Sequence, residues 1–206
     1  MRIRLIFWVA LVLAFGLGPN ETQAQAGLED VGFVFGDTAA PVKIIEFGDF
    51  GCTTCADFWR DSWPQVRHEL IETGRVGWWH VPVTLGYRRG KEAANAAQCA
   101  AEQDGYWPMH ELLLDTQEEW LSAPHPKQLY TRMASEARLD VVAFSACYEE
   151  NRCEERTKAA TRIARRGIRG LPTFFVNGRP VVGSVPYELL LQVVEEAERA
   201  GPGGGP

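Results

Sequence analysis

The chain has 206 residues, of which 46% are apolar and 23% charged. This balance excludes a disordered acidic tail and a fibrous or repeat protein. The formal net charge of -6 argues against a nucleic-acid partner, which would require a basic surface. The chain contains five cysteines. Because five cannot all pair within one chain, at least one thiol is free, reactive, bound to a metal or joined to another molecule.

The first 26 residues are typical of an export signal. Arg2 and Arg4 supply a positive start, an uncharged run covers residues 5–18, and small residues precede a cleavage point after Ala26. We expect a signal peptide at 1–26 and a periplasmic or otherwise exported protein. An uncleaved signal that anchors the chain in a membrane is the weaker alternative, because the run is shorter than the roughly 20 residues that span a bilayer.

The next segment predicts a strand, a helix and a second strand. Residues 27–40 form a lead-in, and the β-branched and aromatic residues from Val42 predict a buried strand. Apolar residues at three- and four-residue steps predict a helix from the cysteines at 52 and 55 to Gly74, kinked at Pro64. Residues 76–83 predict the second strand.

Residues 87–166 are almost entirely helical in pattern, and the β pattern then returns. Helices are expected at about 89–103, 106–116, 126–136 and 141–165, the last with an interruption near Asn151. An Asn177-Gly178 turn then joins strands at 173–176 and 181–182, and a helix follows at 187–200.

These elements predict an α/β fold with a mixed sheet. A strand, helix and strand in succession imply a parallel pair, and the Asn-Gly turn implies an antiparallel pair. We expect one domain from residues 27–86 and 167–200, an all-helical insertion at 87–166 and a disordered tail at 201–206.

Cys52 and Cys55 carry the strongest chemical signal. They lie at the start of a helix that follows a buried strand, where free N–H groups and the helix dipole favour an anion. Cys52 should therefore have a lowered pKa and act as nucleophile and leaving group. Cys55, one turn further in, should be more buried and less reactive. This asymmetry suits thiol–disulfide exchange.

Two other roles for the pair are open. Cys52 and Cys55 could form a zinc site with Cys147 and Cys153, but the wider spacing of the second pair disfavours it. A purely structural disulfide is also disfavoured, because so short a ring restricts the unfolded chain little. We therefore expect no metal and no other cofactor.

Two residues distant from the cysteines sharpen this interpretation. Glu46 lies in an apolar strand six residues before Cys52, where burial would raise its pKa into a range useful for proton transfer, unless the strand has a wet face. Pro172 begins a strand and lacks the N–H that would pair there, leaving backbone available to a substrate chain. On its own, such a proline is more often an ordinary strand boundary.

Three separated motifs together resemble the DsbA-like thiol–disulfide oxidoreductases of the thioredoxin superfamily. They are Glu46-Phe47-Gly48-Asp49-Phe50-Gly51-Cys52-Thr53-Thr54-Cys55, the segment with Gln98-Cys99-Ala100-Ala101-Glu102-Gln103 and Trp107-Pro108-Met109-His110, and Gly170-Leu171-Pro172-Thr173-Phe174. The resemblance covers about residues 30–200 and implies a thioredoxin fold with an inserted helical domain.

The resemblance also implies roles for single residues. Cys52 would attack, Cys55 would resolve the mixed disulfide, and Glu46 would be the buried acid beneath them. Pro172 would be a cis-proline facing the pair. Leu171 would contact the substrate through its backbone. We also expect Thr53 and Thr54, between the two cysteines, to contact the substrate.

The remaining cysteines are Cys99, Cys147 and Cys153. In a continuous helix the Cα atoms of Cys147 and Cys153 would be about 9 Å apart, too far for a disulfide, and their side chains would point to different sides. We therefore expect a structural Cys99–Cys147 disulfide, because the surroundings of Cys147 are apolar. Two buried free thiols are the alternative, and Cys153 is left over.

The sequence thus predicts an exported protein thiol–disulfide oxidoreductase, acting preferentially as a disulfide donor. Its partners would be reduced or misoxidised exported proteins and a membrane or soluble protein that resets the pair, and we expect a monomer. A reductase or isomerase of the same fold is one alternative. A non-catalytic metal-binding or chaperone module that uses Cys52 and Cys55 is another.

The dipeptide between the cysteines generates a first prediction. Strongly oxidising members of the resembled family usually carry a histidine next to the second cysteine, whereas this chain has Thr53-Thr54. Without that cation the Cys52 thiolate loses one source of stabilisation, so the pair should be less oxidising. Equilibration with glutathione buffers measures the potential. A value as high as that of the strongest oxidants of the family would contradict the prediction.

Overall fold

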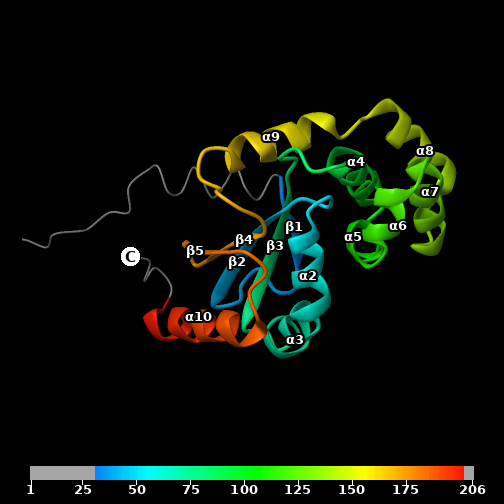
Figure 1. The fold of residues 1–206 in the computed structure, drawn as a ribbon. Helices are drawn as coiled ribbons and strands as arrows, with labels where there is room; N and C mark the ends of the chain where they lie inside the picture. Colours follow the sequence, from blue (N-terminus) through cyan, green and yellow to red (C-terminus); the bar gives the residue numbers. More distant parts are fainter. Residues whose placement is uncertain (1–30, 202–206) are drawn as a thin grey trace, which may run out of the picture.

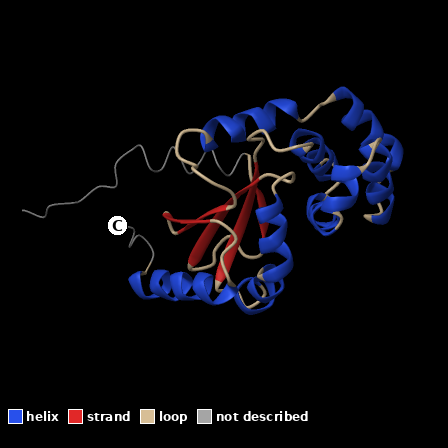
Figure 2. Cartoon of the chain, in the orientation of Figure 1, coloured by secondary structure: helices blue, strands red, loops and turns tan. Residues whose placement is uncertain are grey.

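The computed structural model describes residues 31–201. The expected signal peptide, and the expected tail beyond Gly201, lie outside this part of the chain. A five-stranded sheet with the order β1-β3-β2-β4-β5 forms the centre, and helices pack on it (Figures 1 and 2). The strands are β1 (Phe33–Phe35), β2 (Val42–Gly48), β3 (Val76–Pro82), β4 (Thr173–Val176) and β5 (Arg179–Val182).

The predicted mixed sheet is confirmed. β2 and β3 are parallel, with Val42 opposite Val76, whereas β2 and β4 are antiparallel. β4 and β5 form the predicted antiparallel hairpin. In its turn, Asn177 and Gly178 both have positive φ, 45° and 90°. Asn-Gly suits this left-handed backbone, which matches the twist of the flanking strands.

No strand was predicted in the lead-in before β2, but β1 lies there. Phe33–Phe35 pairs antiparallel with β3, with Phe33 opposite His80. Three residues are too few to establish a two-residue periodicity, and the strand exists because β3 offers it an edge.

The helix after the cysteines has the predicted break near Pro64. α2 (Thr53–Asp61) is followed by α3 (Trp63–Gln65) and by a π-helical turn, η1 (Val66–Ile71). The break begins at Ser62, so Pro64 falls in the first turn of α3, where a missing N–H costs no hydrogen bond within the helix.

The chain between β3 and β4 is helical, as predicted, and α4 to α8 lie together beside the sheet (Figure 1). A helix in the middle of this segment, α6, was not predicted, because it has six residues and follows α5 after a single residue. The predicted interruption near Asn151 is confirmed, since this residue has a left-handed φ of 49°. The helices are α4 (Gly90–Ala101), α5 (Tyr106–Asp115), α6 (Gln117–Ser122), α7 (Pro126–Glu136), α8 (Val141–Glu150) and α9 (Glu154–Ala164).

Helices cover both faces of the sheet, and strand β2 separates the two layers. Ile44 belongs to the core that includes α2 and the final helix, α10 (Tyr187–Ala200). Ile45 and Phe47 belong to a second core, with α9. Since successive side chains of a strand point to opposite faces, Glu46 lies on the same face as Ile44, towards α2.

Candidate active site

Cys52 and Cys55 lie where β2 turns into α2. β2 ends at Gly48, and Cys52 is the N-cap residue of α2. The Cys52 amide donates to the carbonyl of Asp49 at 2.9 Å, and the Cys55 and Ala56 amides donate to the Cys52 carbonyl at 3.2 and 3.3 Å. These bonds hold the first cysteine at the positive end of the helix, as the sequence predicted.

The two thiols differ in acidity more than in exposure. Both are free, and Cys52 and Cys55 are only 1% and 3% exposed. Solvent exposure does not separate the two residues, but Cys55 lies deeper in the protein than Cys52, as the sequence predicted. A hydrogen bond from Cys55 lowers the pKa of Cys52 to about 5, and hydrogen bonds from Thr54 and Tyr87 contribute. The same Cys55–Cys52 hydrogen bond, together with burial, raises the pKa of Cys55 well above its ordinary value.

Leu171 and Pro172 face the pair across the site. The bond between them is cis. The Leu171 carbonyl lies 4.0 Å from the sulfur of Cys52 and accepts a hydrogen bond of 2.9 Å from the Thr54 hydroxyl. The Thr54 oxygen is also 2.9 Å from the sulfur of Cys52. Thr53 is exposed on the first turn of α2.

The Thr54 hydroxyl has one proton, which limits what it can do at one time. While that proton is donated to the Leu171 carbonyl, the Thr54 oxygen can act towards Cys52 only as an acceptor, with the Cys52 thiol as donor. When Cys52 is a thiolate, the hydroxyl can donate to the sulfur only by turning its proton away from the Leu171 carbonyl. The thiolate and this carbonyl therefore compete for one proton.

Glu46 is buried on the α2 side of the sheet, so the wet-face alternative does not hold. It is 6% exposed and accepts a hydrogen bond of 3.2 Å from the indole of Trp78. Burial raises its pKa to about 8, and the charged form of Glu46 in turn raises the pKa of Cys55. His80, opposite Glu46 in β3, is kept neutral by burial, which lowers its pKa to about 3. Glu46 is therefore largely protonated at neutral pH.

Asp49 is a positioning residue that the sequence analysis did not single out. Its carboxylate accepts hydrogen bonds of 2.9 Å from the amides of Gly51 and Leu85. It thereby joins the turn before Cys52 to the loop after β3. That loop carries Tyr87, whose hydroxyl bonds to Cys52. Asp49 lies in the Gly-Asp-Phe-Gly turn directly before Cys52. This place in the sequence is the signal that could have marked it as a residue of the site.

The helical insertion also contributes to the site, through Gln117 at the start of α6. Its side-chain amide donates to the carbonyls of Phe50 and Cys52 at 2.7 and 3.0 Å, and the residue is buried. The sequence analysis missed this residue because it missed α6. No local pattern marks a glutamine 65 residues from Cys52 as its partner.

A shallow groove of about 320 Å³ runs beside the pair. One wall is formed by the loop after β3, with Leu85 and Tyr87, and the other by residues 168–171. Leu171 thus lies between the groove and Cys52. An extended peptide in this groove would pass the sulfur of Cys52 and the backbone of Leu171.

The other cysteines lie in the insertion, away from this site. Cys99 in α4 and Cys147 in α8 are joined by a disulfide, the pairing that the sequence analysis expected. The expectation that Cys147 and Cys153 point to different sides was wrong, because their sulfur atoms are 4.0 Å apart. α8 ends at Glu150, so the chain is not a continuous helix there. Among the described residues, Cys147 and Cys153 cluster with Cys99 and not with Cys52 or Cys55.

Comparison with known proteins agrees with this geometry. A family model described as thioredoxin matches residues 29–196. The chain belongs to the thioredoxin family. Solved structures of DsbA-like proteins share the fold of this chain, as the resemblance implied. These include α-DsbA1 of Wolbachia pipientis (TM-score 0.70, 22% identity, covering 82% of this chain and 92% of that one). Oxidised BdbD of Bacillus subtilis is another (TM-score 0.71, 21% identity, 82% and 94%).

Curated relatives fall into two groups. Na(+)/H(+) antiporter NhaA 3 of Salinispora tropica is 35% identical over 184 residues, which are 84% of this chain but 26% of the antiporter. The chain thus spans about a quarter of that relative. Disulfide bond formation protein D of Bacillus subtilis is 24% identical over 170 residues, which are 79% of this chain and 75% of that protein.

Replacement of Gln117 tests the contribution of the insertion to the site. Gln117→Leu leaves the buried carbonyls of Phe50 and Cys52 without this donor, which should cost about 1–3 kcal/mol of unfolding free energy. Urea unfolding of the reduced protein measures this value. Gln128→Leu, at an exposed position of α7, is the matched control. Equal midpoints for the two variants would contradict the role given to Gln117.

Replacement of Glu46 tests its raised pKa. An acid whose folded pKa of about 8 exceeds its ordinary value of 4.5 destabilises the fold increasingly as the pH rises from the lower to the higher value. Glu46→Gln should therefore flatten the fall in stability of the reduced protein over this window, by about 1.4 kcal/mol per pH unit at most. Urea unfolding at a series of pH values measures the effect. Glu188→Gln, at an exposed position, should leave the slope unchanged.

Proposed function

We propose that this protein is an exported thiol–disulfide oxidoreductase that donates the Cys52–Cys55 disulfide to cysteines of other exported proteins. The observation that carries the proposal is that the pKa values of two thiols in contact, Cys52 and Cys55, are shifted in opposite directions. Cys52 has a pKa lowered to about 5, and the pKa of Cys55 is raised. One sulfur is thus suited to attack and departure, and the other to holding a proton.

In the donor direction, the oxidised pair reacts in two steps. A substrate thiolate attacks the sulfur of Cys52, the bond between Cys52 and Cys55 breaks, and Cys55 leaves as a thiolate that takes up a proton. A second substrate thiolate then attacks the substrate sulfur of the mixed disulfide, and Cys52 leaves as a stabilised thiolate. The substrate gains a disulfide, and the protein pair is reduced by two electrons.

The acidity of Cys52 supports the donor direction. A thiolate that is stabilised in the reduced protein makes the reduced pair more favourable, and the disulfide correspondingly more oxidising. Glu46 is protonated at neutral pH and lies close enough to influence Cys55 electrostatically. It would supply the proton that Cys55 takes up.

Partners and location follow from the same proposal. The substrates would be reduced or misoxidised exported proteins bound along the groove at Leu171, and a membrane or soluble redox protein would reoxidise the pair. Export would depend on the signal at 1–26, and the protein would act as a monomer. Within residues 31–201, no helix is long and apolar enough to cross a membrane.

Replacement of Cys55 tests the proposed function. Cys55→Ala removes the resolving thiol, so mixed disulfides between Cys52 and substrate proteins should accumulate when the variant is exported with its native signal. Non-reducing electrophoresis detects these adducts, and mass spectrometry locates the linkage. Cys52→Ala with Cys55→Ala is the control and should form none at this site. If Cys55→Ala traps no partner through Cys52, the pair does not exchange disulfides with other proteins.

A further inference from the structure

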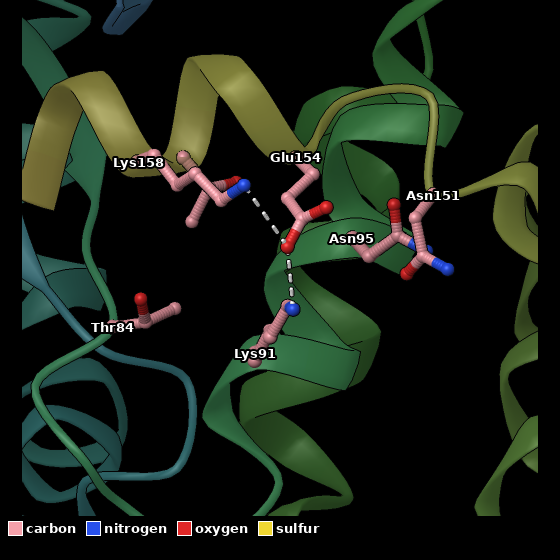
Figure 3. Close-up of a pocket in the computed structure, with 7 residues that line it drawn as sticks. Thr84, Lys91, Asn95, Asn151, Glu154 and Lys158 are labelled. Atoms are coloured by element: carbon pink, nitrogen blue, oxygen red, sulfur yellow. Dashed lines mark hydrogen bonds and ion pairs between the residues drawn. The ribbon is translucent and has the colours of Figure 1, made fainter.

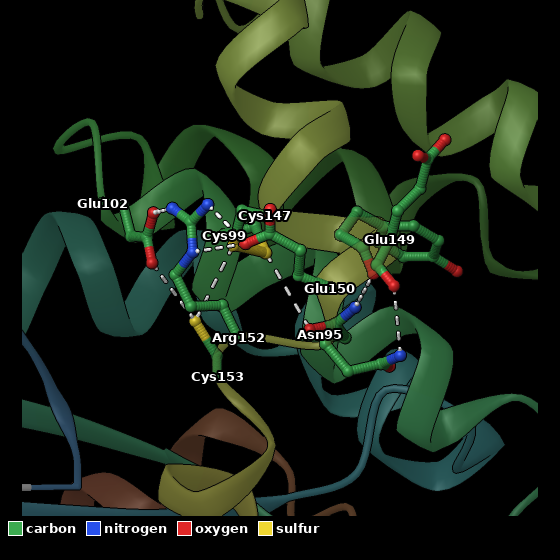
Figure 4. A network of polar contacts seen from close by, with 10 residues as sticks. Asn95, Cys99, Glu102, Cys147, Glu149, Glu150, Arg152 and Cys153 are labelled. Atoms are coloured by element: carbon green, nitrogen blue, oxygen red, sulfur yellow. Dashed lines mark hydrogen bonds and ion pairs between the residues drawn. A yellow bond between two sulfur atoms is a disulfide. The ribbon is translucent and has the colours of Figure 1, made fainter.

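A second group of sulfur atoms lies in the insertion, outside the candidate active site (Figure 4). The Cys99–Cys147 disulfide ties α4 to α8, and the free thiol of Cys153 lies beside it. The sulfur of Cys153 is 4.0 Å from that of Cys147, and all three sulfur atoms lie within 4.8 Å of one another. A thiol beside a disulfide is the arrangement from which exchange begins.

The bend between α8 and α9 fixes this arrangement. α8 ends at Glu150, Asn151 adopts a left-handed backbone, and the amide of Arg152 donates to the carbonyl of Cys147 at 3.3 Å. Cys153 is then the N-cap residue of α9. The reversal brings residue 153 back to residue 147, whereas a continuous helix would separate them.

We propose that Cys99, Cys147 and Cys153 form an intramolecular exchange site in which the disulfide moves between Cys99–Cys147 and Cys147–Cys153. The Cys153 thiol loses its proton, and its thiolate attacks the sulfur of Cys147. The new Cys147–Cys153 bond forms as the Cys99–Cys147 bond breaks, and Cys99 leaves as a thiolate that takes up a proton. No net oxidation or reduction occurs, so no further reagent is required.

The surroundings of Cys153 determine how fast this attack can occur. Its thiol donates to the carboxylate of Glu102 at 3.9 Å, and Glu102 also pairs with Arg152 at 2.8 Å. Burial and the charge of Glu102 raise the pKa of Cys153, and Arg156 and Arg152 oppose them. The thiol form therefore predominates near neutral pH, and exchange should accelerate as the pH rises.

The exchange would change both the accessibility of the free thiol and the links between helices. Cys153 is partly exposed, whereas Cys99 is completely buried. In the first form α4 is tied to α8, and in the second α8 is tied only to the start of α9. The second form would thus release α4, the helix that precedes α5 and Gln117, from its covalent link.

A cavity of about 140 Å³ adjoins the α8–α9 bend (Figure 3). It is lined by Asn95 and by Asn151 and Glu154 from the α8–α9 bend. Asn95 is also a neighbour of Cys99, whose sulfur is 3.8 Å from its side-chain oxygen. The bend therefore borders this cavity, where Glu154 pairs with Lys91 at 2.7 Å and with Lys158 at 3.4 Å.

The test uses the full chain with Cys52→Ala and Cys55→Ala, so that the other pair cannot scramble disulfides. The protein is purified without reductant and incubated at about pH 7 and at about pH 9, where thiolate is more abundant. It is then acidified to stop exchange, unfolded and labelled with a maleimide. Mass spectrometry of its peptides locates the free thiol.

We expect label to appear on Cys99 with time, with an equal loss of label from Cys153. The rate should rise about tenfold per pH unit while the pH is below the pKa of Cys153. Adding Cys153→Ser should abolish label on Cys99. If Cys153 carries all the label in the insertion at both pH values, the proposal is wrong, whatever the function of the Cys52–Cys55 pair.

A second variant tests the new bond directly. In the same background, Cys99→Ala treated with oxidised glutathione should form a Cys147–Cys153 disulfide, seen as linked peptides. Cys99→Ala with Cys153→Ala is the control and cannot form this link. If the folded Cys99→Ala protein keeps Cys147 and Cys153 unlinked, the two sulfur atoms cannot reach bonding distance, and the proposal fails.

Discussion

The position of Cys52 at the N-cap of α2 is the constraint on which the rest of the site depends. The buried strand β2 ends at Gly48. In the turn after it, the backbone N–H groups need hydrogen-bond acceptors, and the sulfur of Cys52 must lie at the start of α2. The Asp49 carboxylate meets this need by accepting from Gly51 and from Leu85 across the site. The same carboxylate thus fixes both Cys52 and the loop that carries Tyr87.

Around Cys52, the buried groups favour a negative charge on one thiol and disfavour it on the other. Neighbouring donors stabilise a thiolate on Cys52, whereas Cys55 and the protonated Glu46 lie where charge is costly. The insertion contributes to this arrangement through Gln117, which holds the carbonyls of Phe50 and Cys52. It is therefore part of the site as well as a cover for it. Its own disulfide, beside Cys153, ties α4 to α8 within the same insertion.

Much of the fold could be predicted because its signals are local. The run of β-branched and aromatic residues in β2, the Asn177-Gly178 turn and the start of α7 at Pro126 each depend on a few adjacent residues. β1 and α6 escaped prediction because elements of three and six residues carry too little periodicity. Each exists through its neighbours. β1 adds to the edge of β3, and α6 is secured by the bonds of Gln117 to the turn before α2.

The sequence by itself determined which residues could carry the chemistry. A Cys-Thr-Thr-Cys motif between a strand and a helix, an acid in an apolar strand and a proline before a strand have the same meaning in any fold that brings them together. Only the tertiary structure decided the distances. It buried both thiols, gave the Thr54 hydroxyl two competing partners and brought Cys153 to Cys147. These outcomes depend on contacts between residues far apart in the chain, or on a single left-handed residue, and no periodic pattern encodes them.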